Sequence, residues 1–530
     1  MLFHSWYFIL FAVAVVGLYY AVPVGRENAW GGKFRRILIL VASLYFYAVW
    51  RPEYLALILA TIGVDYTMAR FIERFGRSAD GAVDGEPGAD VKADAKANIK
   101  RRIALAVSLS FDLGLLFAFK YLGFFEETWN AVVAPWMGKP LDLPKLLLPM
   151  GISFYTFQSL SYVIDVYRGK IPACKSIANY ALYVTFFPQL VAGPIERAPH
   201  LMPQLALEHR FDLGDLQAGM FRILQGFFKK AVLADHLGVF VDGVFNGVAA
   251  GHVSELSPVE LILAGIFFTF QIYFDFSGYS DIAIGIARIF GVRLMENFNA
   301  PLLATSIYDF WKRWHISLTS WFREYVYFSL GGSRKGRPLA VVNVLIVFFL
   351  SGLWHGAAWT FVAWGVCHGV AYVLERPWRK LPVKHPWLGR IKTFALVVLF
   401  FTLFRAPDFG TWLDYIVGIF NFGPFASLTQ AYILPHGDAY LNGPLTLCGG
   451  ACVHSLFCVD NDALHVPAAF SVLIGLLIWG ARSLVTRGGT RGCVVGDEPG
   501  AWRWIWCLVY LLAIILLGRF SGQGFIYFQF

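Results

Sequence analysis

The feature that most constrains this chain is a series of apolar blocks long enough to cross a membrane. Hydrophobic residues make up 57% of the 530 residues. Charged residues make up only 15%, against about 25% in a typical soluble domain, so the chain cannot cover a water-facing surface. Blocks of roughly 17–25 apolar residues match the hydrocarbon thickness of a bilayer. We therefore expect an all-α, polytopic membrane bundle, because a helix satisfies its backbone hydrogen bonds within lipid.

The apolar blocks predict about 11–13 transmembrane or re-entrant helices, which we expect to form a single domain over residues 1–530. Several blocks are short or are interrupted by Gly and Pro, as at Leu148–Gly151 and Phe187–Gln189. Broken backbone at membrane depth survives only where protein or a water-filled cavity satisfies its polar groups, and this favours a central tunnel. The expected spans are Trp6–Val22, Ile37–Trp50, Tyr54–Phe71, Ile103–Phe124, Leu147–Val166, Ala178–Ile195, Leu216–Phe245, Pro258–Phe290, Leu339–Phe349, Ala357–Leu374, Phe394–Phe404, Pro467–Ala481 and Trp504–Leu517.

The distribution of Lys and Arg between loops predicts the orientation of the chain. Four follow the first expected span and seven lie in the third loop, Glu73–Arg102, whereas the second loop has only Arg51. The positive-inside rule places the first and third loops in the cytoplasm and the N-terminus outside. Ser78–Asn98 is rich in Gly, Ala and Asp, so residues 73–102 are expected to form a flexible cytoplasmic loop. This pattern predicts a multi-pass membrane protein.

Other features exclude several classes of function. The net charge of +9 fits basic cytoplasmic loops, and no basic run is patterned for nucleic acid, so no nucleic-acid partner is expected. A serine-hydrolase elbow, a Walker loop and a dinucleotide fingerprint are all absent from the sequence. Cys448, Cys452, His454 and Cys458 are metal-type ligands, but their spacing matches no standard zinc pattern. We therefore expect no metal.

Two stretches place a histidine among tryptophans within apolar sequence, and the first is Phe310–Leu318. Read as one helix, it places Trp311, Trp314 and His315 on one face. Three cations lie close by in the sequence: Lys312, Arg313 and Arg323. A functional imidazole is one interpretation, and an interfacial amphipathic helix with a tryptophan belt is the other.

The second stretch, Ser351–Trp359, places His355 deep in a membrane block between Gly352 and Gly356. Ionisable groups are expensive inside a bilayer, and they are functional candidates for that reason. The small neighbours would let a substrate or another backbone come close. The alternative is that His355 is a hydrogen-bonded histidine at a helix-packing contact, and composition alone favours neither interpretation over the other.

Further polar residues lie within the apolar blocks. Asp275 and Asp281 lie inside the block Pro258–Phe290. They could orient a histidine, bind a cation or hydrogen-bond to broken backbone, and the last use carries as much weight as the other two together. His368 and Glu375 fall on one expected helix and could pair.

The chain resembles the membrane-bound O-acyltransferase family, in the bacterial branch that includes the alginate O-acetylation membrane protein. The resembling motifs are spread over most of the chain, with a motif-bearing core at residues 148–405. They are Leu148–Gln158, Phe187–Ile195, Tyr273–Asp281, Glu296–Asn299, the His315 and His355 stretches, Leu330–Gly336, Phe404–Pro407 and Phe525–Phe528. The departures from the family pattern, Ser78–Asn98 and Cys448–Cys458, lie outside these motifs.

The resemblance implies an O-acyltransferase that transfers an acyl group to a hydroxyl. It makes His355 the catalytic position and His315 the second signature position. The implied donor is a cytosolic acyl thioester, acetyl-CoA in this branch, with no permanently bound cofactor. Lys312, Arg313 and Arg323 are the candidates for holding its phosphates. The implied acceptor is an extracytoplasmic polysaccharide such as alginate, reached directly or through a periplasmic esterase-like partner protein.

The chemistry expected of His355 is general-base activation of the acceptor hydroxyl, an effect typically worth ~10²–10⁴-fold in rate. An acyl-histidine intermediate is the alternative use of the same side chain. We expect the two histidines to approach one tunnel that opens to both membrane faces and narrows near His355. The rival class is a polytopic transporter or flippase that uses Asp275, Asp281 and the two histidines as an ion path. The lack of a detectable internal repeat disfavours many transporter folds.

Overall fold

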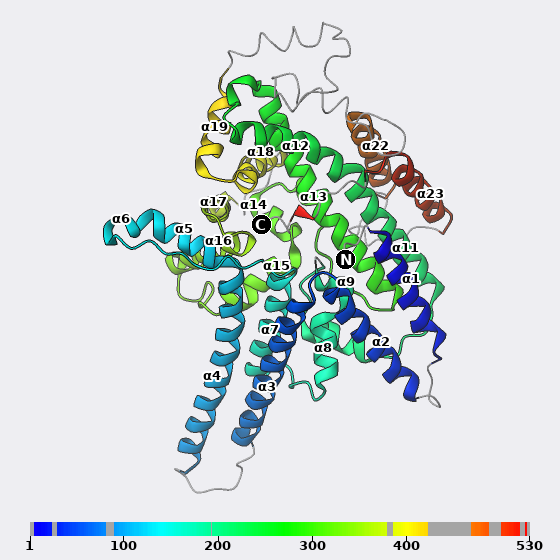
Figure 1. The fold of residues 1–530 in the computed structure, drawn as a ribbon, viewed down its shortest axis with the longest axis vertical. Coiled ribbons are helices and arrows are strands. Elements are labelled where there is room, and N and C mark those ends of the chain that lie inside the picture. The colour runs from blue at the N-terminus through cyan, green and yellow to red at the C-terminus, as the bar shows by residue number, and fades with distance from the viewer. Residues whose placement is uncertain are drawn as a thin grey trace. The chain divides into compact units, whose positions relative to one another are not determined.

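The computed structural model describes residues 5–23, 29–80, 89–191, 193–378, 385–421, 468–486, 500–519 and 525–526. Helix dominates these ranges and no strand occurs in them (Figure 1). The expected all-α, polytopic class is therefore confirmed. Within the described ranges, six helices are long and apolar enough to cross a membrane: Pro52–Gly76, Lys96–Val132, Leu213–Ala249, Pro258–Ile289, Arg337–His355 and Pro386–Arg405. Shorter apolar helices lie at Tyr7–Ala21, Trp359–Leu374, Ser471–Gly480 and Trp504–Leu517.

The chain divides into two compact units, and the first comprises Met1–Met220, Ala283–Glu296 and Ser320–Ser329. Within this unit, α3 and α4 run side by side as an antiparallel pair, and both pack against α7 (Figure 1). Its helices are α1 (Trp6–Ala21), α2 (Ala29–Ala48), α3 (Leu55–Asp80), α4 (Ala89–Leu116), α5 (Leu122–Val132), α6 (Ala134–Met137), α7 (Ile152–Tyr167), α8 (Ile177–Thr185), α9 (Phe187–Leu190), α10 (Ala198–Ala206) and the first part of α11 (Leu213–Phe227).

The second unit comprises Phe221–Ile282, Asn297–Thr319 and Leu330–Phe530. Its core is rich in aromatic side chains, and α16 packs closely against α17. It contains a π-helical turn, η3 (Phe228–Ala234), and the following helices: α12 (Asp235–Ala249), most of α13 (Pro258–Ile289), α14 (Ile307–Arg313), most of α15 (Ile316–Trp321), α16 (Arg337–His355), α17 (Trp359–Leu374), α18 (Pro386–Arg405), α19 (Phe409–Ile419), α22 (Ala468–Thr486) and α23 (Gly500–Leu517).

Local sequence signals begin several of these helices. The side chains of Ser176, Ser306 and Asp408 each accept a hydrogen bond from the backbone N–H three residues later, which caps α8, α14 and α19. Ser, Thr and Asp are favoured at this position because they satisfy a donor that the helix itself leaves unpaired. Pro338 lies in the first turn of α16, where its missing N–H is harmless.

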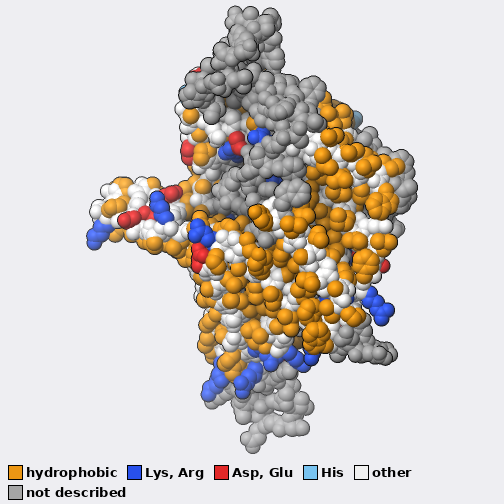
Figure 2. Space-filling model, turned by 45° about the vertical axis from the view of Figure 1, so that its right-hand side comes forward, with side chains coloured by type: hydrophobic (Ala, Val, Ile, Leu, Met, Phe, Trp, Pro, Cys, Tyr) orange, Lys and Arg blue, Asp and Glu red, His pale blue; other side chains and the backbone are white. Residues whose placement is uncertain are grey.

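The surface has the composition of a lipid-facing protein. Large apolar side chains are exposed along α1, with Tyr7 78%, Leu10 68% and Val13 66% accessible. In Figure 2, hydrophobic side chains cover most of the described part of one face, and Lys and Arg gather toward its lower edge. Exposed apolar patches of this extent are rare on soluble monomers, so the surface supports the membrane assignment.

The structure corrects the expected loop at residues 73–102. α3 continues to Asp80 and α4 starts at Ala89, so the described parts of this segment are helical. The two helices support each other there, because the Lys100 ammonium lies 4.6 Å from the centroid of the Phe75 ring. Residues 81–88 lie outside the described ranges, as does the Cys448–Cys458 segment.

Candidate functional site

The expectation of one continuous helix around His315 is wrong. α14 ends at Arg313, α15 begins at Ile316, and His315 lies in the break between them with a φ of 43°. This left-handed conformation costs a non-glycine residue roughly 1–2 kcal/mol, so surrounding contacts must hold it. Two backbone hydrogen bonds do so: Ile316 N–H donates to the Asn297 carbonyl and Asn299 N–H to the Arg313 carbonyl, both at 2.9 Å.

The Asn297 side chain orients the His315 ring. Its Oδ1 lies 3.1 Å from His315 Nδ1 and accepts from the Ser317 hydroxyl at 2.9 Å. The same atom contacts the Ser317 backbone N–H, which can only donate, so the contacting atom is the amide oxygen. An amide oxygen only accepts, and it therefore favours the imidazole tautomer with its proton on Nδ1. In that tautomer, Nε2 is the basic nitrogen of His315.

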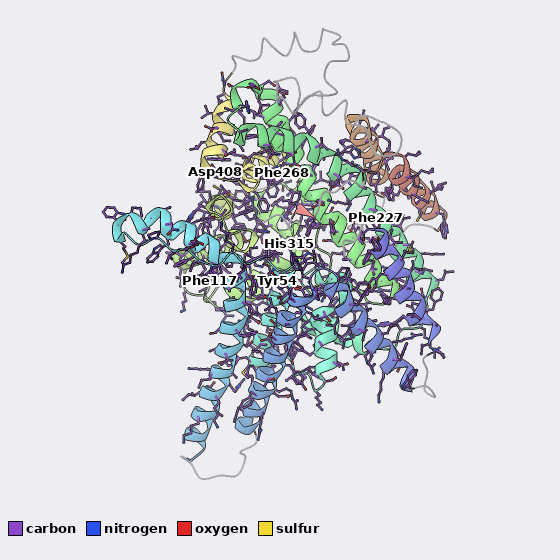
Figure 3. The ribbon with its side chains drawn as sticks, in the orientation of Figure 1. Tyr54, Phe117, Phe227, Phe268, His315 and Asp408 are labelled. Atoms are coloured by element: carbon purple, nitrogen blue, oxygen red, sulfur yellow. The ribbon has the colours of Figure 1, made fainter. Side chains whose placement is uncertain are left out.

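His355 is the last residue of α16, and the fold brings its ring to His315. The centroids of the two imidazoles are 6.3 Å apart. His315 is labelled in Figure 3 together with Phe268 of α13, which belongs to the same unit. The two histidines expected from the sequence thus converge on one place in the second unit.

Aromatic rings enclose both imidazoles. Phe276 lies 4.7 Å from His315, and Trp364 and Phe404 lie 4.9 and 5.5 Å from His355, measured between ring centroids. His315 is 0% exposed and His355 only 2%. Both imidazoles are thus buried, and the expected tunnel that narrows near His355 stays a prediction.

The glycines around His355 make room for another helix. A Cβ atom at Gly352 would collide with the Phe361 carbonyl of α17, and one at Gly365 with the Phe348 carbonyl of α16. At these positions the expected close approach is therefore made by backbone, as in other membrane helix pairs with small residues at the contact. The tight contact fixes the end of α16, where His355 lies.

The two carboxylates of α13 are neutralised by buried cations. Asp281 lies 2.7 Å from both Arg222 Nε and Lys229 Nζ. Lys230 Nζ lies 2.8 Å from Asp275, whose other oxygen accepts the Ile526 backbone N–H at 2.8 Å. Of the three uses considered from the sequence, both carboxylates thus bind cations, which are Lys and Arg side chains of the protein itself. Asp275 also accepts a backbone hydrogen bond. Within the described residues, neither carboxylate forms a hydrogen bond with a histidine.

The segment at residues 525–526 reaches the surroundings of His315. The ring centroid of Phe525 lies 4.4 Å from that of Tyr279 and 5.6 Å from that of Phe276. Phe276 in turn touches the His315 ring. This family-like motif near the end of the sequence therefore belongs to the packing shell of the site.

The cations proposed for the donor have different surroundings. The Lys312 ammonium lies 4.2 Å from the Tyr308 ring centroid, and Arg313 Nε donates to Asp309 at 2.9 Å. Arg323 belongs to the first unit, and its side chain is 62% exposed. Arg313 is thus engaged within its own helix, and no described contact joins these three residues into one anion site.

The suggested pairing of His368 with Glu375 is wrong. The Trp311 indole N–H donates to His368 Nδ1 at 3.3 Å. Glu375 instead accepts from Lys392 at 2.6 Å and from the Ile307 backbone N–H at 2.7 Å. The Glu375 carboxylate, at the end of α17, thus links that helix to α14 and α18, and these two bonds draw it away from His368.

Sequence reasoning missed Asn297 as an orienting group, and it also missed Lys229 and Lys230. Asn297 was noted only as part of a family motif. The positions of the two lysines could have predicted these ion pairs, because ionisable residues inside a membrane block nearly always pair with one another. Asp275 and Asp281 were the available partners.

Comparison with known proteins gives concordant matches. The family model for MBOAT, the membrane-bound O-acyltransferase family, matches residues 171–404. The probable alginate O-acetylase AlgI of Pseudomonas putida is 38% identical over 100% of both chains. The protein of the same name from Azotobacter vinelandii is 37% identical over 80% of this chain and 79% of its own. The peptidoglycan O-acetyltransferase of Helicobacter pylori is 32% identical over 79% of this chain and 80% of its own.

Proposed function

We propose a function for this chain that proceeds from its family, because the chain belongs to the membrane-bound O-acyltransferase family. In this proposal, it passes an acetyl group from a cytosolic thioester to hydroxyls of an extracytoplasmic polysaccharide. Relatives named for alginate O-acetylation make alginate the first acceptor to test. The transfer is direct or proceeds through a periplasmic esterase-like partner. The protein resides in the cell inner membrane with its N-terminus outside.

The observation that carries this proposal is the meeting of His315 and His355 in one buried aromatic site. The two side chains come from different elements, and their ring centroids are 6.3 Å apart. Burial shields such a site from water, which would otherwise hydrolyse a thioester. An imidazole in a dry site can act as the base that an alcohol needs when it attacks a thioester, and the second imidazole can position the donor.

In the proposed reaction, a neutral His355 imidazole accepts the proton of the acceptor hydroxyl. The hydroxyl oxygen attacks the thioester carbonyl and the C–O bond forms. The C–S bond then breaks, and the departing sulfur takes the proton from His355, which releases the thiol and restores the neutral imidazole. General-base assistance of this kind contributes ~10²–10⁴-fold to rate. His315, oriented by Asn297, positions the thioester. Acetyl transfer through an acyl-histidine is the alternative route with the same residue.

The donor is proposed to be acetyl-CoA, with its phosphates kept at the cytoplasmic side. Moving a charged group to the bilayer centre costs at least ~2.5–3.5 kcal/mol, so only the uncharged thioester arm should enter the protein. Lys312, Arg313 and Arg323 remain the proposed phosphate-binding cations. The Arg313–Asp309 pair would have to open for Arg313 to contribute.

The test is acetyl transfer by the purified full chain in lipid nanodiscs. Radiolabelled acetyl-CoA and mannuronate oligomers are supplied with and without the periplasmic partner, and both CoA release and acceptor label are measured. His355→Gln should abolish acceptor labelling, because glutamine cannot act as the base. Normal labelling by a folded His355→Gln protein would reject the assigned role.

His368→Gln is the matched control for this experiment. His368 is as buried as His355 and lies in the same aromatic cluster, but it carries no family signature. Glutamine can still accept the Trp311 N–H, so labelling should persist. Counterflow of substrate without acetyl transfer, by contrast, would favour the rival transporter or flippase.

A further inference from the structure

Two buried carboxyl groups face each other between α3 and α4 of the first unit. Asp65 on α3 and Asp112 on α4 are both 0% exposed. The Ser108 hydroxyl donates to Asp65 Oδ1. Ser108 and Asp112 are one helical turn apart on α4, so they share the face that is turned toward Asp65. Because α3 packs closely against α4, Asp112 therefore lies on the side of α4 that faces Asp65.

Among the residues that the structure describes, no Lys or Arg neutralises this pair. Within the described part of the chain, Asp65 Oδ2 and both oxygens of Asp112 have no hydrogen-bond partner, and no ion pair involves either residue. The buried carboxylates Asp275 and Asp281 of α13, by contrast, each have a lysine within 2.8 Å. Two unpaired negative charges side by side in a low-dielectric interior would repel each other without hydration to compensate. Asp65 and Asp112 therefore need a balancing positive charge that the described residues do not supply.

Buried hydroxyl groups accompany the two carboxyl groups on the helices that pack together here. Thr61 lies one turn before Asp65 on the same face of α3; it is 1% exposed, and its Oγ1 has no partner among the described residues. The Tyr155 hydroxyl is equally buried and belongs to α7, which packs against both α3 and α4. Thr61 adds a neutral oxygen atom on the face of α3 that carries Asp65.

The chemistry of these oxygen atoms limits what Asp65 and Asp112 can bind. Carboxylate and hydroxyl oxygens bind hard cations. No group of three or more His, Cys, Asp or Glu residues suited to a metal ion occurs in the described ranges, and this disfavours a transition metal. Both aspartates lie within helices that are apolar enough to span a membrane, where ionisable residues usually mark an ion or proton site.

We propose that Asp65 and Asp112 form a buried site for one monovalent cation, either a shared proton or an alkali-metal ion. This site is additional to the acyl-transfer site, and its test does not depend on acetylation.

The test uses a lipid-soluble carbodiimide, which modifies a protonated carboxyl group in apolar surroundings but not an ion-paired carboxylate. The full chain in nanodiscs is treated in choline, potassium and sodium chloride at mildly acidic and mildly alkaline pH, and adducts are mapped by mass spectrometry. We expect an adduct at Asp65 or Asp112 in choline chloride. Asp281 is the internal control, because Arg222 and Lys229 keep it charged, and it should stay unmodified.

The salt arms distinguish the two cations. A shared proton predicts labelling that falls as pH rises and does not respond to salt. An alkali-metal ion predicts labelling that sodium or potassium suppresses and choline does not. Asp65→Asn should abolish that protection, since the ion would lose one of its carboxylates.

A second measurement is independent of access by the reagent. Thermal denaturation of the unmodified protein should depend on pH or on the alkali-metal ion, and Asp65→Asn combined with Asp112→Asn should remove this dependence. Absence of both the adduct and the dependence would overturn the proposal, as would equal modification of Asp281.

Discussion

At the scale of single residues, His315 shows how contacts far away in the sequence determine a candidate site. Its left-handed backbone is unfavourable by itself, and the Asn297–Asn299 segment stabilises it through two backbone hydrogen bonds. Strained residues of this kind concentrate at functional sites when the surrounding structure holds them in place. Asn297 is therefore the residue whose loss should most directly disturb the His315 ring.

We predict that Asn297→Ala lowers the kcat of acetyl transfer by about 10- to 100-fold, the range seen when a group that orients a metal-bound histidine is removed. The physical reason is loss of the acceptor that holds the His315 tautomer and ring. Steady-state kinetics with labelled acetyl-CoA would measure the change, and the KM for the donor should change little.

Ser317→Ala is the matched variant for Asn297→Ala. It removes another hydrogen bond to the same Asn297 oxygen without touching His315. Its kcat should stay close to that of the wild-type protein. Equal losses of kcat in the two variants would mean that Asn297 acts only through general stability.

At the scale of elements, the π-helical turn η3 places two adjacent lysines on two different carboxylates. Lys229 binds Asp281, and Lys230 binds Asp275 and Asp235. A π-turn inserts one extra residue into a helical ladder and is often found at functional sites. Here it joins the segment before α12 to α13, the helix whose Phe276 touches His315.

The two lysines should differ in their effect on stability. Lys230→Met leaves Asp275 and Asp235 without their shared cation, and breaking a buried pair in this way costs about 3–5 kcal/mol. Lys229→Met should be milder, because Arg222 still lies 2.7 Å from Asp281. Thermal denaturation in detergent, followed by size-exclusion chromatography, measures both variants. A Lys229→Met protein that is less stable than Lys230→Met would contradict this interpretation of the ion pairs.

At the scale of the whole molecule, the exposed apolar surface and the spanning helices establish a membrane protein, while its orientation remains a prediction from loop charge. Basic residues are concentrated in the first and third loops of the sequence. The positive-inside rule then places Ser78 in the cytoplasm and Lys139, beyond the next expected span, outside. The extension of α3 and α4 beyond the expected loop boundaries does not change this assignment.

Two single-cysteine variants test the orientation in a background that lacks the native cysteines. Lys139→Cys should react with a membrane-impermeant thiol reagent in intact cells, since Lys139 is exposed. Ser78→Cys should react only after lysis. The reverse pattern of labelling would place the N-terminus in the cytoplasm and overturn the proposed direction of acetyl transfer.

The sequence by itself determined the membrane class and the helical composition, and it singled out His315 and His355 as candidate site residues. These depend on local properties: the length of apolar blocks is set by the bilayer, and an imidazole in such a block is conspicuous. Tertiary structure decided the break at His315, the role of Asn297 and the neutralisation of Asp275. Each of these depends on partners that spacing cannot identify, as with Ile526, which lies 251 residues from the carboxylate that it binds. It also decided that Gly352 serves a backbone contact and that Asp65 faces Asp112, because only packing determines which helix faces meet.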